Sequence, residues 1–464
     1  MKARRSCLAL PLLTAAAAGY PAELPPAGLT SALPTPSAGA ASVPLALVLT
    51  LKFILGLVVV MVTVYLVRHV LFTLNRLFGK QRHPYLDVDT ADWKSVTVLV
   101  PAHNEELVIA HALDALLDVD YPPGLMTIVP IDDRSTDGTR AIIRDYAQRY
   151  PDRIRPFYRD RGKPGKAAVL KDTTALIDTE LLIVFDADYV PGRGLIKQLS
   201  APFFDPEVGA VMGRVVPHNT GSNLLTRLLD MERAGGYQVD QQARMNLGLV
   251  PQYGGSVGGT RLSALRAVGG WRDDALAEDT DLTYRLLLHG YKTVYENRSE
   301  CYEEVPELWQ ERSRQLMRWA KGHNQSAFRY AWPVMTSPRL RWQEKLDGLL
   351  LLGVYTVAPW LIVGWLCALA LYYLGEPILP TTLLVMMYMV AFSALGNFAT
   401  FFEIAAAMHL DGARRRLRLL PLNFLGFLLS LINTTRATFL LIVGDAVLGR
   451  ELHWEKTRRY RGSK

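Results

Sequence analysis

The sequence predicts an α/β fold, a mostly parallel sheet with helices on both faces, flanked by transmembrane helices. Two observations lead to this prediction. Between about residues 95 and 325, short β-branched runs alternate with helical patterns, an order that favours a parallel sheet. Long apolar runs lie on either side, and half of the 464 residues are hydrophobic, which is enough for a globular domain and several spans.

The N-terminal region is predicted to lead into a membrane span. Residues 1–43 begin with an apolar stretch that fits either a signal-like or a short membrane segment, and they continue as a Pro/Ala-rich linker. Residues 44–67 are apolar enough for a transmembrane helix. Arg68, Arg76 and Lys80 follow closely, so the next part of the chain is expected in the cytosol.

Residues 90–330 have a lower hydropathy and are predicted to form a cytosolic domain that includes interfacial helices. The expected strands are 95–101, 127–131, 154–158, 181–185 and 209–215. The expected helices between the first four strands are 105–117, 138–150 and 165–177. A further amphipathic helix at 223–245 fits either the membrane surface or an ordinary helix that buries its apolar face.

Residues 345–448 are predicted to be a C-terminal transmembrane region. Two apolar runs of spanning length, 349–374 and 378–402, are separated by a short turn and predict a membrane hairpin. The last apolar segment is interrupted around Arg436, a costly residue at bilayer depth, and indicates a broken or partly interfacial element. The basic tail at 449–464 is expected in the cytosol.

Charge, cysteine content and the composition of the apolar runs argue against several other classes of protein. The net charge of +7 comes from basic residues that gather beside the apolar runs, so we expect membrane lipid and no nucleic acid as a partner. The three cysteines have neither metal-ligand nor redox spacing. A transporter with a regulatory cytosolic domain would carry several ionisable residues inside its spans, and this sequence has few there.

Acidic pairs follow the ends of two predicted strands, where open α/β sheets bind their ligands. Asp132 and Asp133 come after the second strand, although acids are also good turn and helix-capping residues. Asp186 and Asp188 follow the fourth strand and, two residues apart, project to one side. Their oxygens suit Mg²⁺ or Mn²⁺, and a turn with solvated acids is the alternative.

Two further clusters lie near the end of the domain. Glu278 and Asp279 precede a helical pattern, where acids also favour the helix N-terminus. Gln315, Arg318 and Trp319 share one helix face by their spacing. This face offers an amide, a guanidinium for phosphate and a ring on which a sugar can stack. A membrane-surface helix with Arg and Trp anchors is the competing interpretation.

In this order, the four clusters resemble the family-2 inverting glycosyltransferases. The resemblance is to their processive membrane-bound branch, which includes the cellulose, chitin, hyaluronan, poly-N-acetylglucosamine and glucomannan synthases. It covers about residues 95–325 and implies a GT-A-like fold. The family's Thr-Glu-Asp motif lacks its Thr here, where Ala277 stands. Three more segments are similar to family motifs: 101–105, 162–167 and 254–256.

The resemblance implies a role for each motif residue. Asp279 would be the catalytic base beside Glu278, and Asp188 would bind Mg²⁺ or Mn²⁺ with support from Asp186. The nucleotide-sugar is expected to contact Pro101, Glu105, Asp132, Asp133, Lys166, Asp186 and Arg318. The acceptor is expected to contact Gly255, Ser256, Gln315 and Trp319.

The resemblance also implies a function. It is inverting transfer of a hexose or N-acetylhexosamine from a nucleotide-sugar, with a UDP-sugar favoured, to a growing β-linked polysaccharide and its coupled export. The alternative is transfer of a single sugar to a membrane lipid, as in ceramide glucosyltransferases. A transporter with a regulatory domain is an alternative of another class. We expect a multi-pass plasma-membrane protein that binds its donor, a glycan or lipid acceptor, and accessory export or regulatory subunits.

Overall fold

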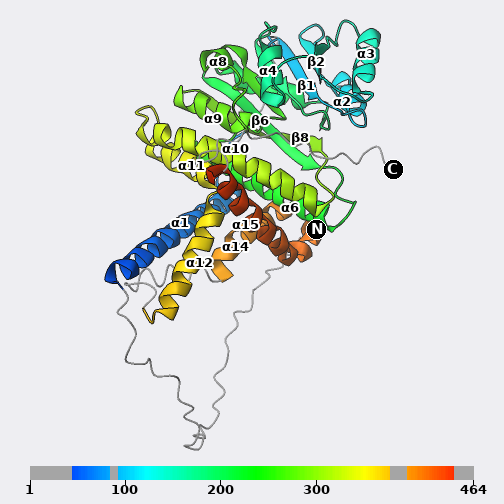
Figure 1. The fold of residues 1–464 in the computed structure, drawn as a ribbon. Coiled ribbons are helices and arrows are strands. Elements are labelled where there is room, and N and C mark those ends of the chain that lie inside the picture. The colour runs from blue at the N-terminus through cyan, green and yellow to red at the C-terminus, as the bar shows by residue number, and fades with distance from the viewer. Residues whose placement is uncertain (1–43, 84–91, 377–393, 444–464) are drawn as a thin grey trace, which may run out of the picture.

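The computed structural model describes residues 44–83, 92–376 and 394–443. An α/β domain lies at one end of the molecule and a group of long helices at the other (Figure 1). The expectations for the N-terminal segment 1–43 and the basic tail 449–464 fall outside the described residues, as does most of the second arm of the expected hairpin.

One eight-stranded sheet forms the centre of the domain, in the order β3-β2-β1-β4-β7-β6-β8-β5. The strands are β1 (Val96–Ala102), β2 (Met126–Asp133), β3 (Phe157–Arg159), β4 (Leu181–Val184), β5 (Val190–Pro191), β6 (Val208–Pro217), β7 (Gly258–Arg261) and β8 (Lys292–Glu303). Strands β3, β2, β1 and β4 run parallel, as do β6 and β8, whereas β7 is antiparallel to both its neighbours. The predicted mostly parallel sheet is confirmed, with β5, β7 and β8 as strands that were not predicted.

Helices cover both faces of the sheet, as predicted. They are α2 (Ile109–Leu117), α3 (Thr139–Arg149), α4 (Lys166–Thr174), α5 (Leu195–Ser200), the 3₁₀ turn η1 (Ala201–Phe204), α8 (Leu262–Ala267) and α9 (Glu278–Leu288). Because side chains alternate along a strand, β1 sends Val98 to the core under α2 and Leu99 to the core under α4 and α9. Burial on both faces explains why its sequence is a continuous apolar run.

The predicted amphipathic helix at 223–245 is one helical segment with a π-helical middle. Its parts are α6 (Leu224–Ala234), η2 (Gly235–Gln241) and α7 (Gln242–Leu247). Met231 and Val239 on its apolar face pack with Phe72 and Ala407, which come from two of the long helices. The sequence allowed either the membrane surface or an ordinary helix that buries its apolar face. The burial of these residues favours the second alternative.

Among the described residues, two helical segments are long and apolar enough to cross a membrane, Leu45–Phe78, which is α1, and Arg414–Val443. Two further helices follow one another, α11 (Trp342–Gly353) and α12 (Val357–Tyr373), with a bend of 77° between them. They would make a third span only if the bent pair is counted as one span. The apolar run expected at 349–374 is thus divided between these two helices, which are separated by a turn at 354–356. Its place as one arm of a membrane hairpin stays a prediction.

The break expected around Arg436 is not found, whereas the partly interfacial alternative stays a prediction. The segment consists of the 3₁₀ turn η3 (Arg414–Leu422) and helix α15 (Asn423–Leu440), which continues through these residues. Asn433 is buried and donates to Ser313 Oγ of α10 (Trp309–Thr336) over 3.3 Å. Its polarity thus serves a helix-helix contact. Helix α14 (Ala394–Leu410) precedes this segment.

Candidate active site

Lys166 lies at the meeting point of four distant parts of the chain. It begins α4, and its ammonium group is 2.5 Å from Asp186 Oδ1, just beyond the end of β4. The same group donates to the carbonyl of Gly255 over 2.9 Å and lies 3.6 Å from Glu278 Oε1 at the start of α9. The structure thus brings together residues that the sequence placed in four separate motifs.

The loop at 254–256 closes this group of residues. Asp186 donates its backbone N–H to Ser256 Oγ over 2.9 Å. Gly255 has a φ of +71°, and a Cβ added there would stand 3.1 Å from the Cβ of Asp279. The predicted acceptor loop and the predicted base are therefore in contact, and a glycine is required between them by both backbone conformation and space.

The charges of this site act on one another. Removal from solvent raises the pKa of both Glu278 and Asp279 above the ordinary range. Desolvation alone would lower the pKa of Lys166, but the neighbouring Asp186 and Glu278 outweigh it, so that pKa is raised. The site therefore holds a firmly charged cation beside carboxylates that accept protons more readily than usual, which suits a base working near neutral pH.

Helix α9 and helix α10 meet directly at the proposed base. Asp279 Oδ1 accepts from the backbone N–H of Thr280 over 2.6 Å, which fixes its orientation at the start of α9. A Cβ added to Gly322 of α10 would lie 2.6 Å from the Cβ of Ala277. Because the two helices touch here, α10 brings its own motif to the same side of the domain.

Two arginines lie close to the ring of Trp319, which belongs to the predicted motif on α10. The guanidiniums of Arg233 and Arg312 lie 4.8 Å and 5.2 Å from the centre of the Trp319 ring. Arg312 also donates to Gln315 Oε1 over 2.7 Å. The two arginines were not predicted, although Arg312 stands three residues before Gln315 on one helix face, a spacing that could have indicated it. Arg318 is partly buried on the same helix.

A second acidic group lies at the carboxyl ends of β1 and β2. Asp132 is fully buried and lies 2.6 Å from Arg140, and Asp133 lies 2.9 Å from Arg159. Glu105, also buried, follows β1 and Pro101 belongs to that strand. Because β1 pairs with both β2 and β4, this group and the Lys166 group share one edge of the sheet. The ion pairs with Arg140 and Arg159 hold Asp132 and Asp133 in place at this edge.

The expected metal ligands Asp186 and Asp188 both follow β4. The side chain of Asp186 is 34% exposed, whereas Asp188 is buried. Over the described ranges, no group of three or more His, Cys, Asp or Glu side chains could form a complete metal cage. Two carboxylates do fit an ion of the Mg²⁺ type, which is commonly held by one or two carboxylates together with substrate phosphates.

Comparison with known proteins places residues 94–322 in the family model described as glycosyltransferase like family 2. A probable glycosyltransferase, YdaM of Bacillus subtilis, is 33% identical over 49% of this chain and 55% of its own length. A beta-monoglucosyldiacylglycerol synthase of Synechocystis sp. is 32% identical over 56% of this chain and 54% of its own length. The chain thus spans little more than half the length of these relatives.

A solved structure shares the fold. The mannosyltransferase PcManGT of Pyrobaculum calidifontis, determined with GDP-Man and Mn²⁺, matches 77% of this chain and 98% of its own with a TM-score of 0.54 and 20% identity. The family match and this shared architecture agree with the mostly parallel sheet described above. Residues 94–322 of this chain are therefore a glycosyltransferase domain of family 2 with the GT-A fold.

Proposed function

We propose that the protein transfers one hexose from a nucleotide-sugar to a membrane lipid of the diacylglycerol type, with inversion at the anomeric carbon. One observation carries the transfer chemistry: Lys166, Asp186 and Glu278 meet beside Asp279 at the edge of the sheet. A cation for the leaving diphosphate and a carboxylate base are the two groups that such a displacement needs.

Each group has a role in the balanced reaction. The acceptor hydroxyl oxygen attacks the anomeric carbon, the bond from that carbon to the phosphate oxygen breaks, and the nucleoside diphosphate leaves. Asp279 takes the proton of the hydroxyl, and its raised pKa matches this task. Lys166 and Arg318 offset the charge on the leaving phosphates, while Glu105 and Asp133 hold the nucleoside.

A divalent cation fits this arrangement. Asp188 and Asp186 would hold Mg²⁺ or Mn²⁺, and the ion would supply charge neutralisation for the diphosphate. The similarity to a mannosyltransferase determined with GDP-Man and Mn²⁺ agrees with this assignment. The donor panel below identifies the nucleotide of the donor, and UDP-hexose is the first candidate.

The lipid acceptor is supported by the position of α10. This helix carries Gln315 and Trp319 and is hydrogen-bonded to the candidate span Arg414–Val443 through Asn324, whose amide donates to Thr438 Oγ1 over 2.8 Å. An acceptor embedded in the membrane would reach the site along this helix. Relatives named beta-monoglucosyldiacylglycerol synthase, from Synechocystis sp. and Nostoc sp., are 32% and 30% identical to this chain. Together these observations favour the lipid over the polysaccharide that the sequence motifs suggested first.

The test uses the full chain in vesicles that contain diacylglycerol. Labelled UDP-glucose, UDP-galactose, UDP-N-acetylglucosamine and GDP-mannose are supplied one at a time with Mg²⁺ or Mn²⁺, and the products are sized by mass spectrometry. We expect one donor to give a lipid with a single β-linked hexose. A product of many sugars would favour the polysaccharide, and the absence of transfer from every donor would overturn the proposed function.

A further inference from the structure

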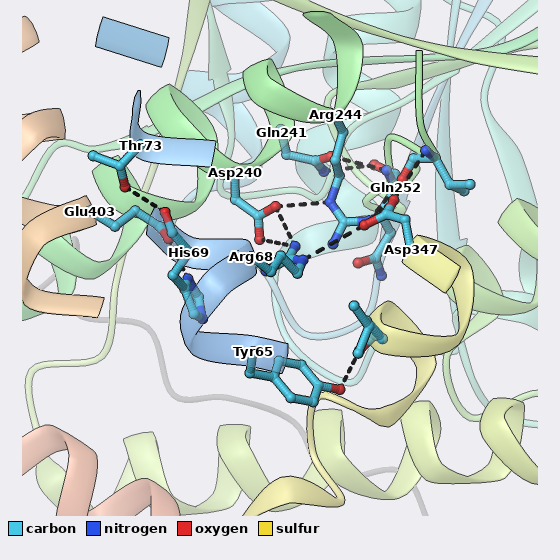
Figure 2. Close-up of polar contacts among 12 residues, drawn as sticks. Tyr65, Arg68, His69, Thr73, Asp240, Gln241, Arg244, Gln252, Asp347 and Glu403 are labelled. Carbon is cyan, nitrogen blue, oxygen red and sulfur yellow. Dashed lines mark hydrogen bonds and ion pairs between the residues drawn. The ribbon is translucent and has the colours of Figure 1, made fainter. Parts of the chain in front are cut away.

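A group of paired charges joins the candidate membrane helix α1 to the domain (Figure 2). Arg68 of α1 is buried and donates to both carboxylate oxygens of Asp240 in η2, over 2.6 Å and 2.9 Å. Arg244 of α7 lies 2.9 Å from Asp240 and 2.7 Å from Asp347 of α11. We call Arg68, Asp240, Arg244 and Asp347 the buried charge cluster.

The cluster is balanced, with two positive and two negative side chains. Desolvation would lower the pKa of Arg244, but Asp240 and Asp347 outweigh it and the pKa is raised. Desolvation would raise the pKa of Asp240, but Arg244 and Arg68 outweigh it and the pKa is lowered. Asp240 and Arg244 therefore keep opposite charges, and the ion pairs of the cluster fix η2 and α7 against α1 and α11.

The cluster also holds the start of the loop that leads to Gly255. Arg244 donates to the carbonyl of Val250 over 3.1 Å, and Asp347 accepts the Val250 N–H over 3.2 Å. Gln241, next to Asp240 in η2, makes the same kind of double contact with Gln252. Its Nε2 donates to the Gln252 carbonyl over 2.9 Å, and its Oε1 accepts the Gln252 N–H over 3.0 Å.

The side chain of Gln252 continues this connection to the proposed base. Its Nε2 lies 3.1 Å from Thr280 Oγ1 and 3.2 Å from His323 Nε2. An amide nitrogen has two protons to donate, so Gln252 can donate to both partners. The Thr280 hydroxyl then has two acceptors within reach, Asp279 Oδ1 at 3.3 Å and His323 Nε2 at 3.2 Å. Desolvation lowers the pKa of His323 to about 4, so its ring is neutral near pH 7. With the ring proton on Nδ1, its Nε2 accepts.

We propose that Gln241 and Gln252 are positioning residues that hold the loop 250–256 and the Thr280 hydroxyl in register with the membrane helix, so that Asp279 faces a lipid-borne acceptor. Neither glutamine touches a reacting atom. The link runs from Arg68 through Asp240 and its neighbour Gln241 to Gln252 and then to Thr280, and every step is a hydrogen bond or a covalent neighbour. The kinetic part of this inference rests on the proposed function.

The link has a clear kinetic consequence. A base displaced by a fraction of an ångström loses rate, whereas the nucleoside of the donor is held by Glu105 and Asp133 at the carboxyl ends of β1 and β2. Loss of either glutamine should therefore lower kcat for transfer by about 100-fold. The affinity for the nucleoside diphosphate should stay within about twofold, because the hydrogen bonds of Gln241 and Gln252 go to each other, to Thr280 and to His323, and to neither Lys166 nor Glu105.

The experiment compares Gln241→Met and Gln252→Met with the control Gln343→Met, which changes an exposed glutamine on α11. Methionine keeps the length of the side chain and removes its hydrogen bonds. Each full-length variant in diacylglycerol vesicles is assayed for kcat, for UDP and GDP binding with Mn²⁺, and for thermal midpoint. The double variant tests the link, since two residues of one connection should together cost no more than either alone.

Amide hydrogen exchange tests the connection without any turnover. In Gln241→Met, the amide of Gln252 loses its acceptor and should exchange at least about tenfold faster than in the wild type. A kcat unchanged in both single variants would overturn the positioning role, and so would nucleotide affinity that falls in parallel with kcat. Absence of transfer by the wild type would instead reject the proposed function. Unchanged exchange in Gln241→Met would then still overturn the link.

Discussion

Gly255 and Asp279 are in such close contact that a Cβ on the glycine would stand 3.1 Å from the Cβ of the aspartate and 3.3 Å from its Oδ2. The carbonyl of the same glycine accepts from Lys166. This one backbone position therefore touches both the proposed base and the proposed phosphate-binding cation, and the geometry of the site depends on it.

Replacing Gly255 with alanine should reduce activity more than stability. The left-handed φ of +71° costs a non-glycine residue about 1–2 kcal/mol, and the added Cβ also pushes against Asp279. Gly124→Ala is a matched control, because Gly124 has a φ of +79° and open space around it. We expect both variants to lose similar thermal stability and only Gly255→Ala to lose about tenfold or more in kcat. Equal rates in the two variants would contradict the contact.

Replacing Lys166 with methionine should weaken nucleotide binding and transfer together. The change leaves Asp186 and Glu278 without their shared cation, so the pKa of Glu278 should rise further and less diphosphate charge is offset. The control is Lys171→Met on the same helix, where the lysine is half exposed and lies 3.5 Å from Asp273. Isothermal titration with UDP or GDP should show about tenfold weaker binding for Lys166→Met alone.

The fold and part of this site could be predicted from the sequence. Buried parallel strands are continuous apolar runs, and β1, β2, β4 and β6 are of this kind. Strand β7 was missed because it begins with Gly258 and Gly259, and a Cβ on either would meet a buried aromatic ring. Strand β7 forms because it pairs with β4 and β6, which are distant from it in sequence.

The same reasoning explains what was missed in the site. Motif residues such as Asp186 and Asp279 follow strand ends or begin helices, so local patterns point to them. Arg233 and Gln252 depend on contacts across the fold, to Trp319 and Thr280 respectively, and no local pattern indicates these. Likewise, the segment around Arg436 was predicted to be broken, because no local pattern indicates the contact of Asn433 with Ser313 of α10, 120 residues away.

Replacing Trp319 with leucine should raise the KM for the acceptor. The guanidiniums of Arg233 and Arg312 lie 4.8 Å and 5.2 Å from the centre of this ring, and leucine removes the aromatic surface proposed for the acceptor. We expect about a tenfold higher KM, which corresponds to about 1.4 kcal/mol. Trp309→Leu, at the start of the same helix, serves as the control. Initial rates at varied diacylglycerol content measure the effect. An acceptor KM equal in both variants would show that Trp319 does not contact the acceptor.

The raised pKa of Asp279 predicts how stability depends on pH. A carboxyl whose folded pKa is raised favours its protonated form, so the charged form destabilises the fold above that pKa and ceases to do so as the pH falls through it. Asp279→Asn should therefore melt at or above the wild-type temperature at pH 8, and the gap should close at lower pH.

Asp281→Asn should behave in the opposite way. This buried carboxylate lies 2.7 Å from Arg285 and accepts from the Tyr330 hydroxyl over 2.5 Å, so its charge is paired. Loss of one partner of a buried pair destabilises by about 3–5 kcal/mol. Differential scanning calorimetry of the two variants should show shifts of opposite sign at pH 8. A large loss of stability in Asp279→Asn would contradict a carboxylate held ready for proton transfer.

The most direct test is sugar transfer by the wild type and Asp279→Asn in the same diacylglycerol vesicles, with nucleotide binding measured on the same samples. We expect the wild type to form the single-hexose lipid. Asp279→Asn should lose at least about 100-fold in kcat while its UDP or GDP affinity stays within about twofold, because it lacks only the base. Transfer by Asp279→Asn at the wild-type rate would contradict the assignment of this site as the centre of glycosyl transfer.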